Sequence, residues 1–391
     1  MVPVPKKQYY QPGSAIRKVL ICPLDWGIGH ATRCIPVIQV MQNLGFEVIV
    51  AGSGRSGEFI KREHPEIRYI DFPGTEITYP LHKSLTLKFI TLTPRLLYNI
   101  FREHRTLKHI VRLSGAGMVI SDNRYGCWHP DIPSVFITHQ LNIQVPATLK
   151  LFKGLLKKLN YFFIHRYTEC WIPDFEPHHG LAGVLSHPKS LPANCHYIGI
   201  LSRFGRFLVQ NKDLYPPSLD LLVMLSGPEP QRTLLEEIVL GQLSKVDLVS
   251  VVVRGIPDSD ETYTLEGKTH VFAHLETPKL YELLARTSLV ICRSGYSSIM
   301  DLVTIGKRAV LIPTPGQTEQ EYLARYLMDK KIYFSMKQQD FDLLYAIELS
   351  KNFPGMVIRN DERDLTERIR ILASDDQAFD TGPEKSAQSR L

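Results

Sequence analysis

A short turn in the C-terminal half of the chain carries residue types that bind anions. The strand-like run Ser288–Cys292 leads directly into Arg293–Gly295, and a helical pattern follows. Such a turn points several backbone N–H groups and the positive end of a helix at one place, where a diphosphate would fit. Side-chain donors are expected from Arg293, Ser297 and Ser298. Asp301 follows one to two turns into the helix, a suitable distance for contacting ribose hydroxyls, so the segment indicates a nucleotide-sugar site.

A glycine-containing loop near the N-terminus holds a candidate general base. It follows the strand-like run Lys18–Cys22 and places His30 at the mouth of a helix. Gly27 and Gly29 allow the backbone to approach a ligand closely. A histidine at that position can act as a general base, although it could equally cap the helix or pack in the turn.

An acidic residue at the end of a later strand could support this histidine. The apolar run Met118–Ile120 leads to Asp122. In a doubly wound sheet this strand can lie beside the first, where Asp122 would orient His30 and stabilise its protonated form. Such a pair could deprotonate an acceptor hydroxyl. The alternative is that Asp122 starts a turn with Asn123.

Three further loops follow strands. Ser226 and Gly227 precede a helix and could contact phosphate with Arg232 as counter-charge, or could simply start that helix. Glu319 and Gln320 could bind sugar hydroxyls, or could be first-turn residues favoured by the helix dipole. The GxGxxG match at 52–57 follows the second strand rather than the first, so we interpret it as a polar loop.

The elements that position these residues alternate between apolar strand-like runs and amphipathic helices. This alternation predicts an α/β fold with parallel sheets covered on both faces. It breaks between Ile198 and Pro217 and then restarts, which indicates two Rossmann-like domains with a ligand cleft between them. The expected divisions are a flexible lead-in (1–16), an acceptor domain (17–200), a linker (201–217), a nucleotide-sugar domain (218–350), a C-terminal helix region (351–375) and a disordered tail (376–391).

The amino-acid composition and charge favour some classes of protein and exclude others. The 391 residues are 44% hydrophobic and 22% charged, which is typical of a soluble globular protein. The net charge of +6 is not gathered into Lys/Arg runs, so nucleic acid is not an expected partner. Six cysteines without CxxC spacing predict reduced core residues and no metal site. The N-terminus lacks an apolar signal region and no run approaches the roughly 18 residues of a membrane span, so we expect a cytoplasmic protein.

Two basic, apolar segments raise the question of membrane contact. Ala147–His165 contains lysines and large apolar residues at mixed helical spacing, and Leu85–Val111 is similar, with Pro94 expected to break or kink it. Such helices can lie in the interface of an anionic membrane, here at its inner face. They can equally be core-facing helices with solvated lysines.

These motifs, in their order and spacing, resemble the GT-B glycosyltransferases, in particular the MurG-like family 28 enzymes and the UDP-glucuronosyl/UDP-glucosyltransferase superfamily. The resemblance covers roughly residues 17–350. It implies that His30 is the catalytic base, supported by Asp122, and that Asp301 holds the ribose. It further implies donor contacts from Gly29, Ser294, Gly295, Ser298 and Gln320, and recognition of the base by the loop that contains His274 and Leu275.

The chain departs from the MurG pattern at two points. His139–Asn142 is similar to the H-E-Q-N segment, with Gln140 and Leu141 in place of its glutamate and glutamine. The Ser226–Pro228 loop also differs from the glycine-rich loop of that family. These departures argue against the MurG acceptor and leave glycosyl transfer in place.

The resulting hypothesis is a metal-independent, inverting glycosyltransferase without a cofactor, which uses a nucleotide sugar, most simply a UDP-sugar. The acceptor is a lipid-linked or small molecule. Two alternatives are a nucleotide-sugar 2-epimerase of the same fold and a non-catalytic scaffold that binds a nucleotide or a partner protein. The sequence does not define the sugar, the acceptor or the oligomeric state.

Overall fold

The computed structural model describes residues 18–25, 27–74, 85–145, 151–177, 180–207, 219–358 and 362–374, with side chains from residue 96 onward in the third range. The expected lead-in and tail lie outside these ranges, as do residues 208–217 of the expected linker.

The N-terminal domain is built on a parallel sheet. Within the described residues its strand order is β3-β2-β1-β4-β5-β6-β7. The strands are β1 (Lys18–Pro23), β2 (Glu47–Gly52), β3 (Arg68–Asp71), β4 (Met118–Asp122), β5 (Ser134–Ile137), β6 (Glu169–Ile172) and β7 (Cys195–Tyr197). The helices are α1 (Ile28–Asn43), α2 (Gly54–Glu63), α3 (Leu85–Ser114) and α4 (Lys153–Ile164). Because β1 and β4 are neighbours and Pro23 pairs with Asp122, the carboxyl ends of both strands open onto the same edge.

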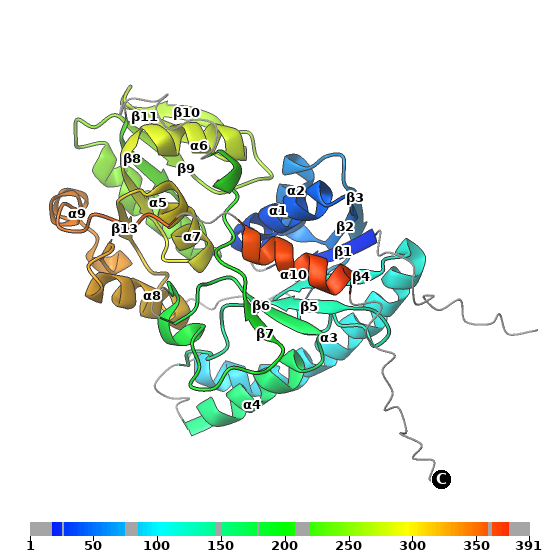
Figure 1. Ribbon diagram of the computed structural model, residues 1–391. Helices are drawn as coiled ribbons and strands as arrows, with labels where there is room; N and C mark the ends of the chain where they lie inside the picture. Colours follow the sequence, from blue (N-terminus) through cyan, green and yellow to red (C-terminus); the bar gives the residue numbers. More distant parts are fainter. Residues whose placement is uncertain are drawn as a thin grey trace, which may run out of the picture.

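The C-terminal domain repeats this design. Its described strands are ordered β10-β11-β9-β8-β12-β13-β14. They are β8 (Leu219–Met224), β9 (Ser250–Val253), β10 (Thr262–Leu265), β11 (Thr269–Phe272), β12 (Thr287–Cys292), β13 (Ala309–Leu311) and β14 (Phe334–Ser335). The helices are α5 (Gln231–Leu243), α6 (Thr277–Arg286), α7 (Tyr296–Ile305), α8 (Thr318–Asp329), α9 (Leu343–Ser350) and α10 (Arg363–Ser374). The expected α/β class with two doubly wound, parallel-dominated sheets is confirmed (Figure 1).

Two local expectations differ from the structure. The edge strand β10 pairs antiparallel with β11 and was not expected, because its residues are mostly exposed and lack an apolar run. Helix α3 continues through Pro94, so the expected break there is wrong. Proline removes one backbone hydrogen bond, which a long helix packed on a sheet can tolerate.

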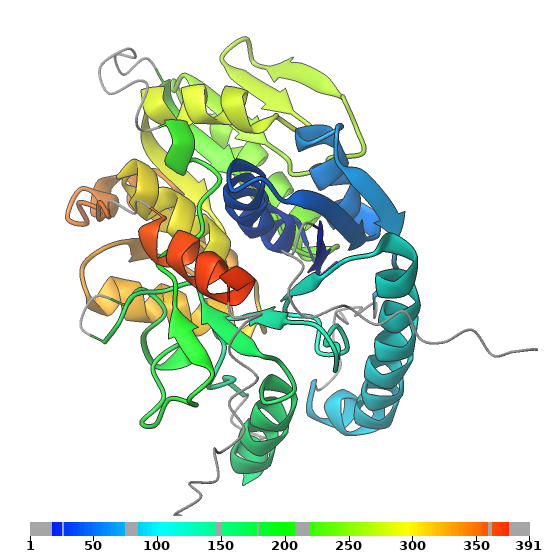
Figure 2. The same cartoon turned by 45° about the vertical axis from the view of Figure 1, so that its right-hand side comes forward.

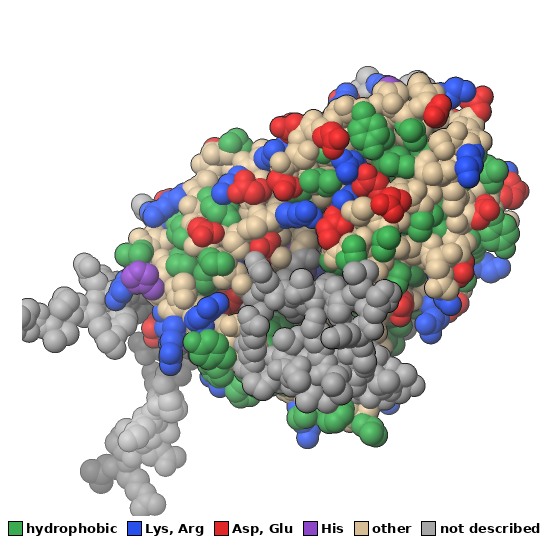
Figure 3. Space-filling view, turned by 180° about the vertical axis from the view of Figure 1, so that it is seen from behind, with side chains coloured by type: hydrophobic (Ala, Val, Ile, Leu, Met, Phe, Trp, Pro, Cys, Tyr) green, Lys and Arg blue, Asp and Glu red, His purple; other side chains and the backbone are tan. Residues whose placement is uncertain are grey.

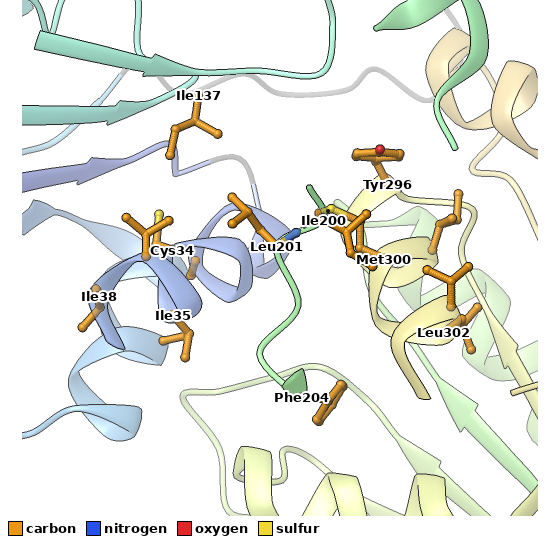
Figure 4. Packing of buried hydrophobic residues seen from close by; sticks show 14 of the residues in the cluster. Cys34, Ile35, Ile38, Ile137, Ile200, Leu201, Phe204, Tyr296, Met300 and Leu302 are labelled. Atoms are coloured by element: carbon orange, nitrogen blue, oxygen red, sulfur yellow. Dashed lines mark hydrogen bonds between the residues drawn. The ribbon is translucent and has the colours of Figure 1, made fainter. Parts of the chain in front are cut away.

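The linker is buried as far as Phe204. Ile198, Ile200, Leu201 and Phe204 are at most 2% exposed, and they pass between α1 and α7. Figure 4 shows Ile200 and Leu201 between Cys34 on α1 and Met300 on α7. One hydrophobic core therefore includes residues of both domains and of the linker. The first residues of the linker, expected to be a polar connection, are part of the packing that fixes the cleft.

The chain returns to the N-terminal domain at its end. Helix α10 packs on α1, with Leu365, Ile369 and Leu372 buried (Figures 1 and 2). The guanidinium of Arg368 on α10 donates to the buried carboxylate of Glu169 on β6. The helix thus ties the two domains together on the side of α1.

Surface charge is mixed. On the face shown in Figure 3, positive and negative side chains are interspersed, so the basic excess is not gathered into one patch there. None of the helices in the described part of the chain combines the length and apolar character needed to cross a membrane.

Candidate active site

A cavity of about 640 Å³, counted with its opening to solvent, lies where the two domains meet. Its walls come from the α1 and α2 side of the N-terminal domain, from Arg203 in the linker and from the strand ends of the C-terminal domain. Residues expected to contact a nucleotide sugar that line it are Gly29, Ser226, His274, Leu275, Ser297, Ser298 and Asp301.

His30 and Asp122 lie in contact at the edge of the N-terminal sheet. His30 is in the first turn of α1, which Gly27 makes possible by adopting a φ of 142°. The His30 Nδ1 atom lies 2.7 Å from Oδ2 of Asp122. His30 is 21% exposed, whereas Asp122 is fully buried. A proton on Nδ1 donated to Asp122 leaves Nε2 free to accept another proton, which is the arrangement of a general base.

Asp122 has a second cationic partner. Arg33, one turn after His30 on α1, donates from Nε to Oδ1 of Asp122, and its Nη2 lies 3.0 Å from His30 Nδ1. Burial favours a raised pKa for Asp122, but Arg33 and His30 outweigh it and hold this pKa below its usual range. The pKa of His30 is lowered, first by burial and then by Arg33. A neutral imidazole beside a carboxylate is therefore the state at neutral pH.

Glu319 lies against the N-terminal domain. It is in the first turn of α8, and its carboxylate accepts from His139 Nε2 at 2.7 Å and from the amide of Gln140. The His139 ring stacks on Tyr296 of α7 with ring centroids 4.2 Å apart. The segment that resembles H-E-Q-N thus contacts the start of both helices that the sequence assigned to the donor.

The turn before α7 faces the glycine loop. Gly295 is the residue before the helix, and Ser297 Oγ donates to the carbonyl of Gly29 at 2.7 Å. Ser294 Oγ donates to the carbonyl of Gln320 at 2.8 Å. The cavity therefore lies at the N-terminus of α7, where the helix dipole favours an anion.

Arg293 does not face this cavity. Its side chain is 1% exposed at most and donates to the backbone carbonyls of Gln231, Ile312 and Pro313 and to Gln338 Oε1. The expectation that it contacts diphosphate is corrected accordingly: the guanidinium joins the segment after β13 to the start of α5 and to Gln338. Arg232 is likewise paired with Glu229 and Glu236, so it is not the expected counter-charge for phosphate.

Asp301 lines the cavity from α7 and contacts the linker. Ser202 Oγ donates to its Oδ1 at 2.6 Å, and Arg203 Nε lies 3.5 Å from Oδ2. Burial raises the pKa of Asp301 to about 6, although Arg203 and Ser202 oppose this. Sequence reasoning missed both linker residues, because a Ser-Arg pair between domains carries no motif by itself.

The far end of the cavity is apolar. His274 follows β11, and its ring meets Phe59 of α2 edge to face at 5.8 Å. Its Nε2 atom is buried without a hydrogen-bond partner, and burial lowers the pKa of this histidine to about 4. Leu275 and Ser226 also line this end. Gly227 adopts a φ of 105° in the neighbouring loop.

Gln320 is engaged within its own domain. Its Oε1 accepts from the backbone N–H of Thr314 at 2.8 Å, and the residue is 9% exposed. It fixes the loop before α8 rather than projecting into the cavity. Within the described residues, no group of three or more His, Cys, Asp or Glu side chains is arranged to hold a metal ion.

Comparisons with known proteins agree with this architecture. Residues 251–377 match the model of the glycosyltransferase family 28 C-terminal domain. An uncharacterised glycosyltransferase of Methanosarcina acetivorans is 24% identical over 334 residues, covering 80% of this chain and 81% of that protein. The glycosyltransferase SnogD from Streptomyces nogalater superposes with a TM-score of 0.54 at 13% identity, covering 92% of this chain and 100% of that one, which shows the fold.

A shorter stretch is similar to a better defined enzyme. Over 61 residues, 15% of this chain and 16% of the relative, it is 39% identical to the UDP-N-acetylglucosamine--N-acetylmuramyl-(pentapeptide) pyrophosphoryl-undecaprenol N-acetylglucosamine transferase of Granulibacter bethesdensis.

Two doubly wound domains that enclose a cavity at the N-terminus of a C-terminal-domain helix have the architecture of the GT-B fold. The C-terminal part of the chain thus matches the family 28 glycosyltransferase domain, and most of its length is similar to a glycosyltransferase of Methanosarcina acetivorans.

Proposed function

We propose that this chain transfers a sugar from a UDP-sugar to an acceptor hydroxyl with inversion and without a metal ion. The observation that carries the proposal is the cavity at the N-terminus of α7: it is lined by Gly29, which precedes the candidate base His30 in the chain and contacts Ser297 directly. A base close to an anion site is what attack on an anomeric carbon and departure of a diphosphate require.

The proposed chemistry follows from the contacts. His30 Nε2 takes the proton of the acceptor hydroxyl while Asp122 accepts from Nδ1 and stabilises the imidazolium that forms. The backbone N–H groups at the start of α7, with the hydroxyl of Ser298, stabilise the charge that develops on the diphosphate. Asp301 accepts from the ribose, and the His274 end receives the base. UDP is favoured because the relative from Granulibacter bethesdensis is named for a UDP-sugar donor.

A donor panel tests this proposal. UDP-, GDP- and dTDP-sugars are offered with a broad acceptor set in EDTA, and both transfer and donor hydrolysis are measured. We expect turnover of a UDP-sugar that His30→Ala reduces by at least about a hundredfold, the loss typical of a removed general base. His64→Ala is the control, since that histidine pairs with Glu66. Full activity of His30→Ala would remove His30 from its role.

Product analysis decides between reaction types. An inverted anomeric configuration in the product supports direct attack by the acceptor, whereas conversion of the donor sugar without acceptor would indicate the epimerase. UDP binding without turnover across the panel would indicate a scaffold. The reported relatives whose activity is named are transferases.

The proposed acceptor is a hydroxyl of a lipid-linked molecule at a membrane surface. The turn before α4 and α4 itself carry apolar side chains on the outside of the protein: Leu151 is 95% exposed, Leu155 64% and Phe162 49%. Helix α4 contains three lysines and no acidic residue. In the same domain, α3 exposes Tyr98 by 67% and Phe101 by 56%. Apolar groups beside lysines favour the interface of an anionic membrane.

Vesicle sedimentation tests this surface. We expect the protein to bind phosphatidylglycerol vesicles more strongly than phosphatidylcholine vesicles, and Leu151→Glu/Leu155→Glu to abolish the binding. Leu344→Glu is a matched control, because Leu344 is 61% exposed on α9 of the other domain. Equal sedimentation of all three proteins would contradict membrane contact through α4.

A further inference from the structure

Arg33 is buried at the candidate base although no motif pointed to it. The residue is 2% exposed. Its guanidinium contacts three groups: Nε donates to Asp122 Oδ1, Nη2 lies 3.0 Å from His30 Nδ1, and Nη1 lies 3.4 Å from His139 Nδ1. A planar guanidinium offers donors in a fixed fork, so one side chain can hold several groups in a defined geometry.

The contacts at His30 Nδ1 cannot all be hydrogen bonds at once. If Nδ1 carries a proton, it donates to Asp122 Oδ2 at 2.7 Å, and Nε2 is free to act as a base. If Nδ1 is bare, it accepts from Arg33 Nη2 at 3.0 Å, and the proton on Nε2 blocks that role. Because Nε of Arg33 holds Oδ1 of Asp122, the other carboxylate oxygen is aimed at His30. The shorter contact is the one that keeps Nε2 free.

We propose that Arg33 is a positioning residue that orients Asp122 and keeps the His30 imidazole neutral, and that His139 extends this control across the cleft to Glu319. The inference rests on the proposed role of His30 as base. Arg33 itself touches neither donor nor acceptor in this scheme.

The charges around His30 support this assignment. The groups that face it are Arg33 on the same helix, Asp122 at the end of β4 and Glu319 on α8. The positive charge of Arg33 opposes a proton on His30, whereas the carboxylates of Asp122 and Glu319 favour one. Burial and Arg33 accordingly lower the pKa of His30 against the opposing effect of Asp122 and Glu319. The imidazole is thus available as a base at neutral pH.

A continuous set of contacts crosses the cleft from this point. His139 Nε2 lies 2.7 Å from Glu319, so a proton on Nε2 leaves Nδ1 as acceptor for Arg33. We call Asp122, Arg33, His139 and Glu319 the cross-cleft network. Its last member belongs to α8 of the other domain, so the complete network exists when the domains are together, as they are here. Domain closure and the ionisation of His30 are thereby linked.

Histidine NMR on the ligand-free full-length protein tests the proposal without a substrate. The His30 imidazole signal is assigned by its absence in His30→Ala and titrated with pH. Removing the positive charge in Arg33→Met should raise the pKa of His30, and Arg33→Lys should restore part of the wild-type value. Glu319→Gln removes a negative charge and should move it the opposite way. Arg62→Met is the control, because Arg62 also crosses the cleft but pairs with Asp260.

Two outcomes would overturn the proposal. One is an unchanged His30 titration in a folded Arg33→Met protein. The other is a titration that moves equally in Arg62→Met, which would indicate a general effect of domain contact. If Arg33→Met does not fold, Arg33→Lys and Glu319→Gln carry the test.

Activity adds a separate readout with the UDP-sugar that the donor panel identifies. For Arg33→Met we expect kcat at pH 7 to fall about tenfold and to recover at higher pH, since the acid limb of the profile follows the pKa of His30. A uniform loss at every pH would mean that Arg33 is merely structural. If no donor is turned over, the proposed function fails, and the NMR titration still decides the role of Arg33.

Discussion

Replacing Asp301 with asparagine should stabilise the free protein and weaken nucleotide binding. The carboxylate is 6% exposed, accepts one hydrogen bond from Ser202, and lies 3.5 Å from Arg203 Nε. Its pKa is raised by burial from the ordinary 3.8 to about 6. Since the folded state binds this proton more tightly than the unfolded state, stability falls as pH rises from 3.8 to about 6, and the whole cost is present above that.

The size of the effect follows from that pKa. A carboxyl whose pKa moves from 3.8 to about 6 prefers its protonated form by about 3 kcal/mol on folding. Asparagine keeps the oxygen that accepts from Ser202 and carries no charge, so Asp301→Asn should recover up to about 3 kcal/mol at pH 7.5, a few degrees in Tm, and almost nothing near pH 4. It also removes the acceptor proposed for two ribose hydroxyls. A hydrogen bond to a charged group contributes about 1.5–3 kcal/mol, so UDP affinity should fall at least tenfold.

Differential scanning fluorimetry between pH 4 and 8 and calorimetric titration with UDP measure the two effects. Asp329→Asn is the matched control, because Asp329 is exposed at the end of α8, away from the cavity, and should change neither quantity. A lower Tm for Asp301→Asn at pH 7.5 would show that the Arg203 contact outweighs the cost of burial. Unchanged UDP affinity would refute the assignment of Asp301 to the donor.

Two further changes probe how the domains are held. In Gly29→Ala the new Cβ would lie 3.2 Å from Ser297 Oγ, so we expect a loss of about 1–3 kcal/mol in the free energy of unfolding and weaker UDP binding by calorimetry. The double variant with Ser297→Ala removes this close contact and should recover part of the lost stability. Glu169→Gln removes the buried carboxylate that accepts from the Arg368 guanidinium on α10, so denaturant unfolding should show a loss of about 3–5 kcal/mol in the free energy of unfolding. Arg370→Gln is the control, because Arg370 is exposed on the same helix and its replacement should change little. An unchanged midpoint for Glu169→Gln would argue against a role of α10 in holding the domains.

The donor side of the cavity could be anticipated from sequence because it depends on local order along the chain. A strand followed by a small-residue turn and a helix places backbone N–H groups at the sheet edge, whatever packs elsewhere. The contact between Asp122 and His30 needs one more assumption, that their strands are neighbours. The β1–β4 pairing supplies it, since doubly wound sheets place the first strand centrally.

The sequence does not predict the direction in which three arginine side chains point, nor the partners that they contact far away in the chain. Arg293 follows its strand in the position of a phosphate contact, yet its guanidinium turns to backbone carbonyls from two separate segments, at Gln231 and at 312–313. Arg33 looks like an ordinary surface residue of an amphipathic helix, yet its guanidinium meets Asp122 at the end of β4 and His139 after β5, which are 89 and 106 residues away in the chain. Arg203 depends on the path of the linker between domains, which no local pattern encodes.

The two ends of the cleft differ in how their polar groups are satisfied. At the His274 end a buried ring nitrogen has no partner, and at Asp301 burial keeps the carboxylate in an unfavourable state. A ligand that brings hydroxyl groups and a nucleobase would relieve both costs, so this end of the cavity suits the binding of a nucleoside. At the other end His139 and Glu319 satisfy each other. A sugar or acceptor that enters there must replace an existing contact between domains, and the same contact continues through Arg33 to the candidate base. A ligand that binds at the His274 end does not have to replace a contact between the domains. The His139–Glu319 end is therefore the part of the cleft where domain closure is coupled to the candidate base.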